Sequence, residues 1–330
     1  MGTDVQKTLN RQRLEWLDVA KGITIWLMII GHMPNYIPAV LREVIYSFHI
    51  PFFFMASGYC FKPEKYGLYD FIKQRVRKLL IPYIAFSLAC VLMRVVLLPE
   101  KADSLRTGMK QIFVDGAGGD IEWFFLALFW TELIAFLISR LNDRKKILAA
   151  ALCIVLLGAA MSEVNMVLPL KLSSSCTALA FFCIGWYMRK NSNVKMRILY
   201  FAFVWALCFL AMYGSTGETW ELVNNECSNI MLGFGSAAAG SILLMKAAFC
   251  ICKTKFKIFI SFFSFVGRKS LWIYPLSSSV PHLAMDVLRS RGVEILHQSV
   301  SIKMMIYLLS WAGILGLAKI MDTNRLTHGR

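Results

Sequence analysis

The sequence predicts an all-α, polytopic membrane protein with about ten transmembrane helices and both termini in the cytoplasm. The first observation is composition: the 330 residues are 57% hydrophobic and only 17% charged, whereas soluble chains carry about 25% charged residues. The second is that the apolar residues form runs near the ~20 residues that a bilayer-crossing helix needs. The third is that Lys and Arg lie in short clusters between these runs, as cytoplasmic loops do.

Ten apolar runs are predicted to be transmembrane helices. In chain order they cover 17–33, 44–61, 79–98, 122–139, 147–162, 172–188, 197–213, 229–245, 270–288 and 302–318. A further apolar run at 256–266 is too short to cross a bilayer, and we expect it to be an interfacial or re-entrant piece.

The Lys and Arg residues fix the predicted orientation. With the N-terminus inside, the segments on the inner side hold 26 Lys and Arg and the outer loops hold 8. This asymmetry places the N-terminal segment 1–16 and the tail 319–330 in the cytoplasm. Residues 1–330 are predicted to form one domain in the cell (inner) membrane. The net charge of +16 therefore reflects topology, and nucleic acid is not expected as a partner.

The nine cysteines give no sign of a metal site or a disulfide framework. All but one lie in or beside apolar runs, and they form no CxxC pair and no His/Cys ligand spacing. We expect small, reduced packing residues, and we predict no metal.

The first predicted span carries three ionisable residues on one side of the helix. Asp18 and Lys21 lie near its inner end and His32 near its outer end. Lys21 and His32 are eleven residues apart, close to three full turns, and about 16 Å apart along the axis. Such groups usually face the interior of a bundle and mark a functional path. The alternative is that Asp18 and Lys21 reach the inner interface and that His32 packs with a hydrogen bond.

The second span brings another histidine to the same depth. His49 lies near its outer end, just before Pro51, which suits a first helical turn. Histidine is the commonest general acid or base in proteins. Two histidines at one mouth, in a chain with only five, therefore indicate a catalytic centre more strongly than either alone.

Two acidic residues of the fourth span also stand out. Glu122 begins it and matches Arg94, near the outer end of the third span, in depth, so we expect a structural ion pair between them. Glu132 lies near the middle of the span and needs a partner or water there. A helix dipole or a hydroxyl of a neighbouring helix is its alternative partner.

A basic cluster precedes the third span. Arg75, Arg77 and Lys78 lie in the first large inner loop, where they offer charge and donors to phosphate groups. The alternative is that they serve as a topology signal and contact lipid headgroups.

Five segments of the chain together carry a resemblance to a known family. Two form its opening: LDVAKGITIWLMIIGH (17–32) and IYSFHIPFFFMASGY (45–59). Three lie later: RVRKLLIPY (75–83), IEWFFLALFWTEL (121–133) and FVGRKSLWIYPL (265–276). In these segments the sequence resembles acyltransferase family 3, the bacterial membrane O-acetylases of surface glycans, and its fucose 4-O-acetylase-like branch in particular.

The resemblance implies a ten-helix enzyme that moves an acyl group, usually acetyl, from cytoplasmic acyl-CoA to a sugar hydroxyl on the outer side. Acyl-CoA is then a co-substrate, and no permanently bound cofactor is expected. The family signature has an Arg where this chain has Lys21, so charge is kept but a bidentate contact is lost. Many members have a histidine where this chain has Ser277, and His282 lies five residues further on. The chain resembles members without an extracellular esterase-like domain.

The residues then take the following expected roles. Lys21, with Arg75, Arg77 and Lys78, holds the phosphates, and Asp18 positions Lys21. His32 is the general base for the sugar hydroxyl. His49 orients that hydroxyl or stabilises charge on the thioester oxygen. The sequence does not decide between direct transfer and an acyl-histidine intermediate.

The remaining candidates belong to the predicted substrate site. They are Glu122, Glu132 and Trp123. The Trp123 ring either stacks on a sugar at the outer mouth or belongs to an interfacial aromatic belt.

Two other functions fit ten helices with buried charges. One is a secondary transporter or flippase of a glycan intermediate, although we find no paired interrupted helices in two repeat halves. The other is a non-catalytic sensor or scaffold, which leaves the two histidines unexplained. Turnover of a thioester separates the enzyme from both.

Overall fold

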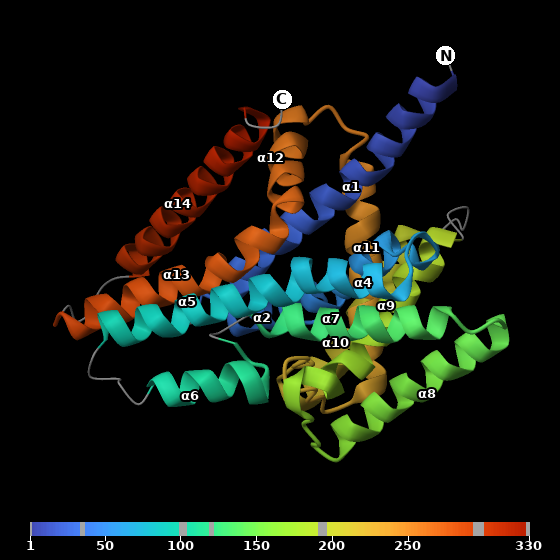
Figure 1. Ribbon diagram of the computed structural model, residues 1–330, viewed down its shortest axis with the longest axis horizontal. Coiled ribbons are helices and arrows are strands. Elements are labelled where there is room, and N and C mark those ends of the chain that lie inside the picture. Colours follow the sequence, from blue (N-terminus) through green and yellow to red (C-terminus); the bar gives the residue numbers. More distant parts are fainter. Residues whose placement is uncertain are drawn as a thin grey trace.

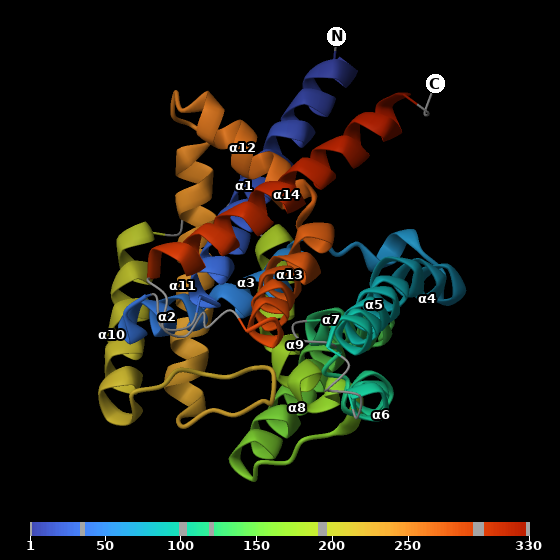
Figure 2. The ribbon, with the colours of Figure 1, turned by 90° about the vertical axis from the view of Figure 1, so that its left-hand side faces the viewer.

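The computed structural model describes residues 2–33, 37–98, 104–118, 122–190, 197–292 and 300–327. Every regular element in these ranges is helical, apart from an isolated antiparallel bridge between Glu221 and Glu226. Figures 1 and 2 show the helices crossing one another at widely different angles. The predicted all-α class is confirmed.

The helices follow the predicted runs closely. In chain order they are α1 (Gly2–Gly31), α2 (Ala39–Tyr46), α3 (His49–Cys60), η1 (Pro63–Lys65), α4 (Leu68–Arg75), η2 (Val76–Leu80), α5 (Ile81–Leu97), α6 (Ser104–Lys110), η4 (Gln111–Asp115), α7 (Trp123–Ser139), α8 (Arg144–Glu163), η5 (Pro169–Lys171), α9 (Leu172–Lys190), α10 (Ile198–Thr216), α11 (Ile230–Ile251), α12 (Lys257–Arg268), α13 (Ser270–Ser290) and α14 (Val300–Thr327).

Several helices have the length and composition of membrane spans. Five described stretches qualify: Ala39–Cys60, Leu68–Leu97, Arg144–Glu163, Ile198–Thr216 and Ile230–Ile251. Two shorter apolar helices, Trp123–Ser139 and Met304–Ile320, accompany them. The short apolar run predicted before the ninth span is helix α12, which packs along α1.

The outward surface of α10 is a continuous apolar stripe. Leu199, Phe203, Leu207 and Leu210 recur at helical spacing and are 80%, 67%, 58% and 64% exposed. A soluble protein rarely exposes so continuous an apolar stripe. In a bilayer the same stripe contacts acyl chains, and the backbone polar groups are already paired within the helix.

Two helix crossings are close enough to require glycine. A Cβ on Gly22 of α1 would lie 2.0 Å from the carbonyl oxygen of Phe263, and one on Gly267 of α12 would lie 1.8 Å from that of Asp18. Gly58 of α3 and Gly185 of α9 form a second reciprocal crossing, with distances of 1.9 Å to the backbone oxygens that they face. Small residues allow such contact between membrane helices.

The second predicted span is broken near its N-terminal end. Helix α2 ends at Tyr46 and α3 begins at His49. The joint is held by α10 and α11: Trp205 Nε1 donates to Ser47 Oγ at 3.1 Å, and Ser241 Oγ donates to the Phe48 carbonyl at 3.3 Å. His49 therefore has a fixed position at the start of a helix.

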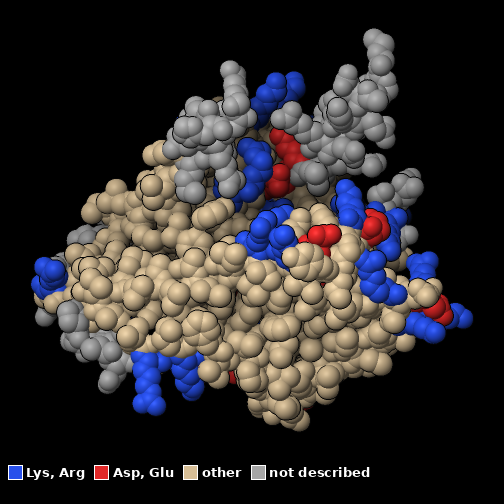
Figure 3. Space-filling view, viewed as in Figure 1, with Lys and Arg blue, Asp and Glu red and all other residues tan. Residues whose placement is uncertain are grey.

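The two ends of the molecule differ in charge. The start of α1, the end of α14 and the α11–α12 connection lie along its upper edge in Figures 1 and 2. The α8–α9 and α10–α11 connections lie at the lower edge. In Figure 3, Lys and Arg side chains gather over the upper middle and right of this face, whereas most of the lower half is uncharged.

Candidate active site

A cavity of about 960 Å³ opens at the basic end of the bundle. Its walls come from α1, α3, α4, η2, α7, α12 and α13, from the end of α9, and from the segment 62–66 between α3 and α4. Seven cationic side chains line it: Lys21, Lys62, Lys65, Arg75, Lys78, Arg189 and Arg268. Only Asp18 and Glu132 oppose them among the lining residues, so the cavity attracts anions.

Arg75 is fixed on two sides within this cavity. Its Nε lies 2.6 Å from Glu132 Oε2, and its guanidinium lies over the Phe71 ring at 4.9 Å. Phe71 in turn stacks on Phe136 with 4.1 Å between ring centroids. Glu132 thus has the partner that its depth requires, and this partner is Arg75 rather than a helix dipole or a hydroxyl.

The crossing of α1 and α12 places more charges at the cavity. Lys21 Nζ lies 3.6 Å from Asp18 Oδ1, as expected for a carboxylate that positions the lysine. Arg268 follows Gly267 at the end of α12, and its Nη1 donates to Ser264 Oγ at 2.6 Å. The close approach of the two helices therefore brings Arg268 and Lys21 to the same wall.

The two predicted histidines lie together at the far ends of α1 and α3. The His32 and His49 ring centroids are 6.2 Å apart. His32 Nδ1 lies 2.8 Å from the Met28 carbonyl and His49 Nδ1 lies 3.0 Å from the Ile45 carbonyl. A carbonyl only accepts, so each Nδ1 carries a proton and each neutral ring has its lone pair on Nε2. In this tautomer, Nε2 is the acceptor atom of each ring.

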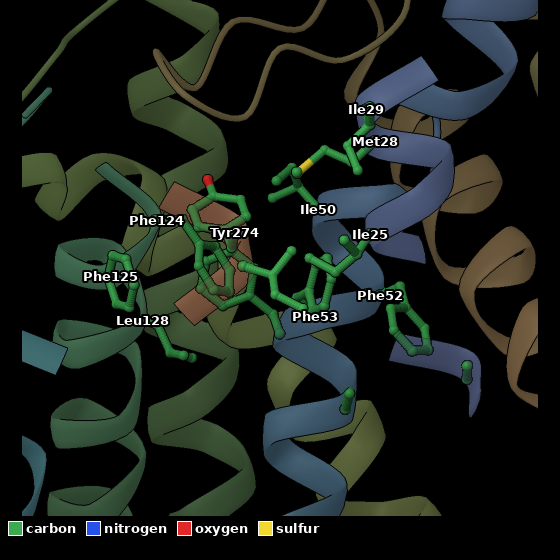
Figure 4. Close-up of a cluster of buried hydrophobic side chains, with 14 of the residues drawn as sticks. Ile25, Met28, Ile29, Ile50, Phe52, Phe53, Phe124, Phe125, Leu128 and Tyr274 are labelled. Atoms are coloured by element: carbon green, nitrogen blue, oxygen red, sulfur yellow. The ribbon is translucent and has the colours of Figure 1, made fainter. Parts of the chain in front are cut away.

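An apolar wall separates the cavity from the histidines. Phe53 of α3 and Phe124 and Leu128 of α7 line the deep end of the cavity. The Phe124 ring contacts Phe53 at 5.8 Å and Tyr274 of α13 at 5.4 Å. Figure 4 shows these side chains pointing toward one another.

The same helices continue beyond this wall. Ile25 and Met28 of α1 lie in sequence between Lys21 and His32, and Ile50 of α3 lies between His49 and Phe53; Figure 4 shows all three in the same cluster. All three side chains are buried. One face of α1 and one face of α3 therefore run from the basic cavity, through the wall, to the histidine pair.

Comparison with known proteins decides the family. The family model for the acyltransferase domain of acyltransferase family 3 matches residues 14–318, nearly the whole chain. The chain belongs to acyltransferase family 3. No curated protein and no solved structure matches it. The protein is therefore a membrane acyltransferase of family 3, and the cavity and the histidine pair are its candidate active site.

The structure corrects the prediction for Arg77 of this family 3 acyltransferase. Arg77 is exposed and does not line the cavity, whereas its neighbours Arg75 and Lys78 do. Arg75 ends α4, and the π-helical turn η2 that follows turns Lys78 toward the cavity but not Arg77. The basic cluster therefore divides into two cavity residues and one surface residue.

The structure shows hydroxyl and thiol partners for Glu122, where an ion pair with Arg94 was expected. Glu122 is fully buried and its Oε1 accepts from Ser279 Oγ at 3.2 Å and from Cys90 Sγ at 3.5 Å. Glu122 does not line the cavity, and its contacts tie α7 to α5 and α13.

The Trp123 ring is buried in the structure. Its side chain is only 6% exposed and packs edge-on against Phe124 at 6.4 Å. Both roles expected for it, sugar stacking at the outer mouth and membership of an interfacial belt, need an accessible ring. The Trp123 ring instead supports the Phe124 ring by packing against it.

The late polar residues of α13 contact their own helix and α14. Ser277 Oγ donates to the Tyr274 carbonyl at 2.7 Å, and His282 Nδ1 lies 3.2 Å from Ser278 Oγ. The His282 ring packs edge-on near Tyr307 of α14 at 6.3 Å. His282 therefore lies on the α14 side of its helix and does not line the cavity.

Four cavity cations were not singled out from the sequence. Lys62 and Lys65 come from the loop after α3, and Arg189 and Arg268 from the ends of α9 and α12. Arg189 Nη1 donates to the Tyr59 carbonyl at 3.0 Å. All four belong to inner segments rich in Lys and Arg, and only the packing of distant helices distinguishes them from their neighbours.

A second, smaller pocket of about 310 Å³ lies at the end opposite to the basic cavity. Glu163, Glu218, Glu221 and Glu226 line it, and its described lining residues include no Lys or Arg. Burial, with Glu226 and Glu218 nearby, raises the pKa of Glu221. This surface is therefore better suited to neutral or cationic groups than to anionic ones.

The second pocket is connected to α2, the helix that precedes His49. Thr219, which lines the pocket, donates to Glu43 Oε2 of α2 from its backbone nitrogen at 3.0 Å and from Oγ1 at 2.7 Å.

Among the described residues, no group of three or more His, Cys, Asp or Glu is arranged to hold a metal ion.

Proposed function

We propose that the protein transfers an acyl group, acetyl in the simplest case, from cytoplasmic acyl-CoA to a hydroxyl of an extracytoplasmic or lipid-linked glycan. The observation that carries this proposal is the shared path: α1 and α3 line the basic cavity at one end and bear the histidine pair at the other. CoA carries phosphates at one end and its thioester at the other. One molecule can therefore engage both parts of the site.

The proposed topology has ten spans, both termini in the cytoplasm and a location in the inner membrane. It is supported by the gathering of cationic side chains at the end that also holds the cavity (Figure 3). Cytoplasmic loops of membrane proteins carry the excess of Lys and Arg. In this orientation the cavity opens to the cytoplasm, where acyl-CoA is found.

The cavity cations suit the phosphate groups of the donor. Arg75 has a fixed plane, which favours paired hydrogen bonds to phosphate oxygens. Lys21, Lys78 and Arg268 add charge around it. The thioester arm then extends toward the wall of Phe53 and Phe124, and these rings must separate for it to pass.

His32 is proposed as the general base. Its Nε2 takes the proton of the sugar hydroxyl while that oxygen forms a bond to the thioester carbonyl carbon. The carbon–sulfur bond then breaks, the electron pair leaves with the CoA sulfur, and the imidazolium returns its proton to the thiolate. The products are the acylated glycan and free CoA.

His49 is proposed to orient the hydroxyl. With Nδ1 donating to the Ile45 carbonyl, a neutral His49 accepts at Nε2 and has no further proton to give to an oxyanion. Of the two roles expected for it, a neutral ring fits orientation: its Nε2 can accept from a neighbouring hydroxyl of the sugar while His32 takes the proton of the reacting hydroxyl. A charged ring would be needed to stabilise the thioester oxygen.

Turnover of acetyl-CoA by the protein in nanodiscs tests this function. We expect CoA release to rise when mixed oligosaccharides from bacterial surface glycans are added. His32→Ala is expected to lower the stimulated rate about a hundredfold or more, since a general base contributes that much, while acetyl-CoA still binds. Lys21→Ala is expected chiefly to weaken acetyl-CoA binding.

Two results would count against the proposal. Near-wild-type transfer by His32→Ala removes the base assignment. Absence of both acetyl-CoA binding and CoA release in the wild type would favour a transporter or flippase instead.

A further inference from the structure

A third aromatic ring lies against both histidines. The Tyr46 ring centroid is 5.5 Å from that of His32 and 5.0 Å from that of His49. The two imidazole centroids are 6.2 Å apart. The three rings therefore form a triangle in which Tyr46 contacts the histidine of each helix.

Gly31 provides the space that Tyr46 occupies. A Cβ at Gly31 would lie 2.9 Å from Tyr46 Cε1 and 3.3 Å from Ile45 Cγ2, which is closer than normal van der Waals contact. The Tyr46 hydroxyl also donates to the Gly31 carbonyl at 3.3 Å. The residue just before His32 thus receives the ring that contacts His32.

Tyr46 connects a helix joint to α1. It is the last residue of α2, and His49 begins α3. The other side of this joint is held by Trp205 and Ser241, which bond to Ser47 and Phe48. His49 is therefore positioned from α10 and α11 on one side and through Tyr46 from α1, the helix of His32, on the other.

We infer that Tyr46 is a positioning residue, whose ring, seated on Gly31, sets the spacing and relative angle of His32 and His49. This inference rests on the proposed function, because it matters only if the two imidazoles act together on a substrate. A displacement of about 1 Å in a catalytic group can lower a rate about a hundredfold. The ring, rather than the hydroxyl, provides both contacts with the imidazoles.

Two substitutions at Tyr46 separate the ring from the hydroxyl. Tyr46→Phe keeps the ring and is expected to retain acceptor-stimulated CoA release within about threefold of the wild type. Tyr46→Leu removes the ring and is expected to lower kcat by about tenfold or more. The KM for acetyl-CoA should stay within about twofold in both, because the cavity cations are untouched.

Gly31→Ala tests the same geometry without changing any side chain that contacts an imidazole. Its new methyl group pushes the Tyr46 ring away, so kcat should fall with little change in the KM for acetyl-CoA. If Tyr46→Leu does not fold, Gly31→Ala still tests whether the position of the Tyr46 ring affects kcat.

Tyr83→Leu is the matched control. Tyr83 is buried, whereas Tyr46 is half-buried. The Tyr83 hydroxyl, like that of Tyr46, donates to a backbone carbonyl, in this case that of Ile112 at 2.7 Å. Its loss should lower the yield or the unfolding temperature but leave kcat per folded molecule unchanged. The folded amount is measured by acetyl-CoA binding in each preparation.

Several results would overturn the inference. They are wild-type kcat in Tyr46→Leu or in Gly31→Ala, equal losses in Tyr46→Phe and Tyr46→Leu, or a kcat loss in Tyr83→Leu as large as that in Tyr46→Leu. Failure of the proposed function would show differently, as a wild-type protein whose CoA release does not depend on His32.

Discussion

The guanidinium of Arg75 is held in place before any donor binds. Glu132 contacts it at 2.6 Å on one side, and the stacked rings of Phe71 and Phe136 support it on another. A buried charge pair of this kind contributes little net stability. Its consequence is that the remaining donors of Arg75 have a fixed direction, which suits the recognition of a phosphate group.

Arg75 and Arg77 offer a matched pair for testing phosphate recognition. Arg75→Gln is expected to raise the Kd for acetyl-CoA about tenfold, because a hydrogen bond to a charged group is worth about 1.5–3 kcal/mol. Arg77→Gln makes the same change two residues away, outside the cavity, and should alter Kd by no more than about threefold. Isothermal titration in nanodiscs measures both. Equal effects of the two variants would contradict the assignment of the cavity.

At the scale of single residues, helical spacing was a sound guide where it stayed within one helix. A helix with 3.6 residues per turn places Asp18 close to Lys21. It also places His32 at the opposite end of the same side of α1. Pairings between helices were less predictable. Similar depth suggested Glu122 for Arg94, but Glu122 bonds Ser279, which is 157 positions away, and no local pattern indicates such a contact.

The wall between the cavity and the histidines is a property of several helices together. Its rings come from α3, α7 and α13. No single helix shows it in sequence, because each ring is one of many apolar residues in its span. A resting bundle needs such a wall, since an open water path from end to end would let ions and protons cross the membrane.

Access of a thiol reagent tests the wall. Cys60 lines the cavity and is exposed, so a membrane-impermeant charged maleimide that enters the cavity should label it. A new thiol introduced by Met28→Cys lies behind the wall and should remain unlabelled. Adding Phe53→Ala should make position 28 reactive, as judged by peptide mass spectrometry.

Phe52→Ala is the control for this test. Phe52 is fully buried next to Phe53 but does not line the cavity. Both substitutions delete the same side chain and carry a similar cost of about 3–5 kcal/mol. Reactivity of position 28 in the Phe52 variant, or in a protein with an unaltered wall, would show that these rings do not close the path.

Hydropathy predicted which segments are helical better than where helices break or begin. The apolar runs correspond to helices from α1 to α14, because main-chain hydrogen bonds must be satisfied within each span. The break after Tyr46 was missed, since residues on both sides of it are apolar. Helix α4 was taken as part of an inner loop, because its Lys and Arg residues lower the mean hydropathy of a segment that is helical in the structure.

At the scale of the whole molecule, charge distribution and packing give the site its polarity. The basic cavity lies at one end and an acidic pocket at the other, and the histidine pair lies beyond the wall from the cavity. The sequence predicted this polarity from its count of Lys and Arg in alternate loops. It did not predict the cavity, because helices far apart in the chain form its walls, and α9 and α12 bring Arg189 and Arg268 to it.

The central claim is that an acyl group passes through the bundle from one side of the membrane to the other. It is tested most directly in proteoliposomes that carry bacterial surface oligosaccharides inside and receive radiolabelled acetyl-CoA outside only. We expect labelled oligosaccharide inside the vesicles, and none with His32→Ala. Label that appears only when acetyl-CoA and oligosaccharide share one side of the membrane would contradict a transmembrane path through the cavity and the histidine pair.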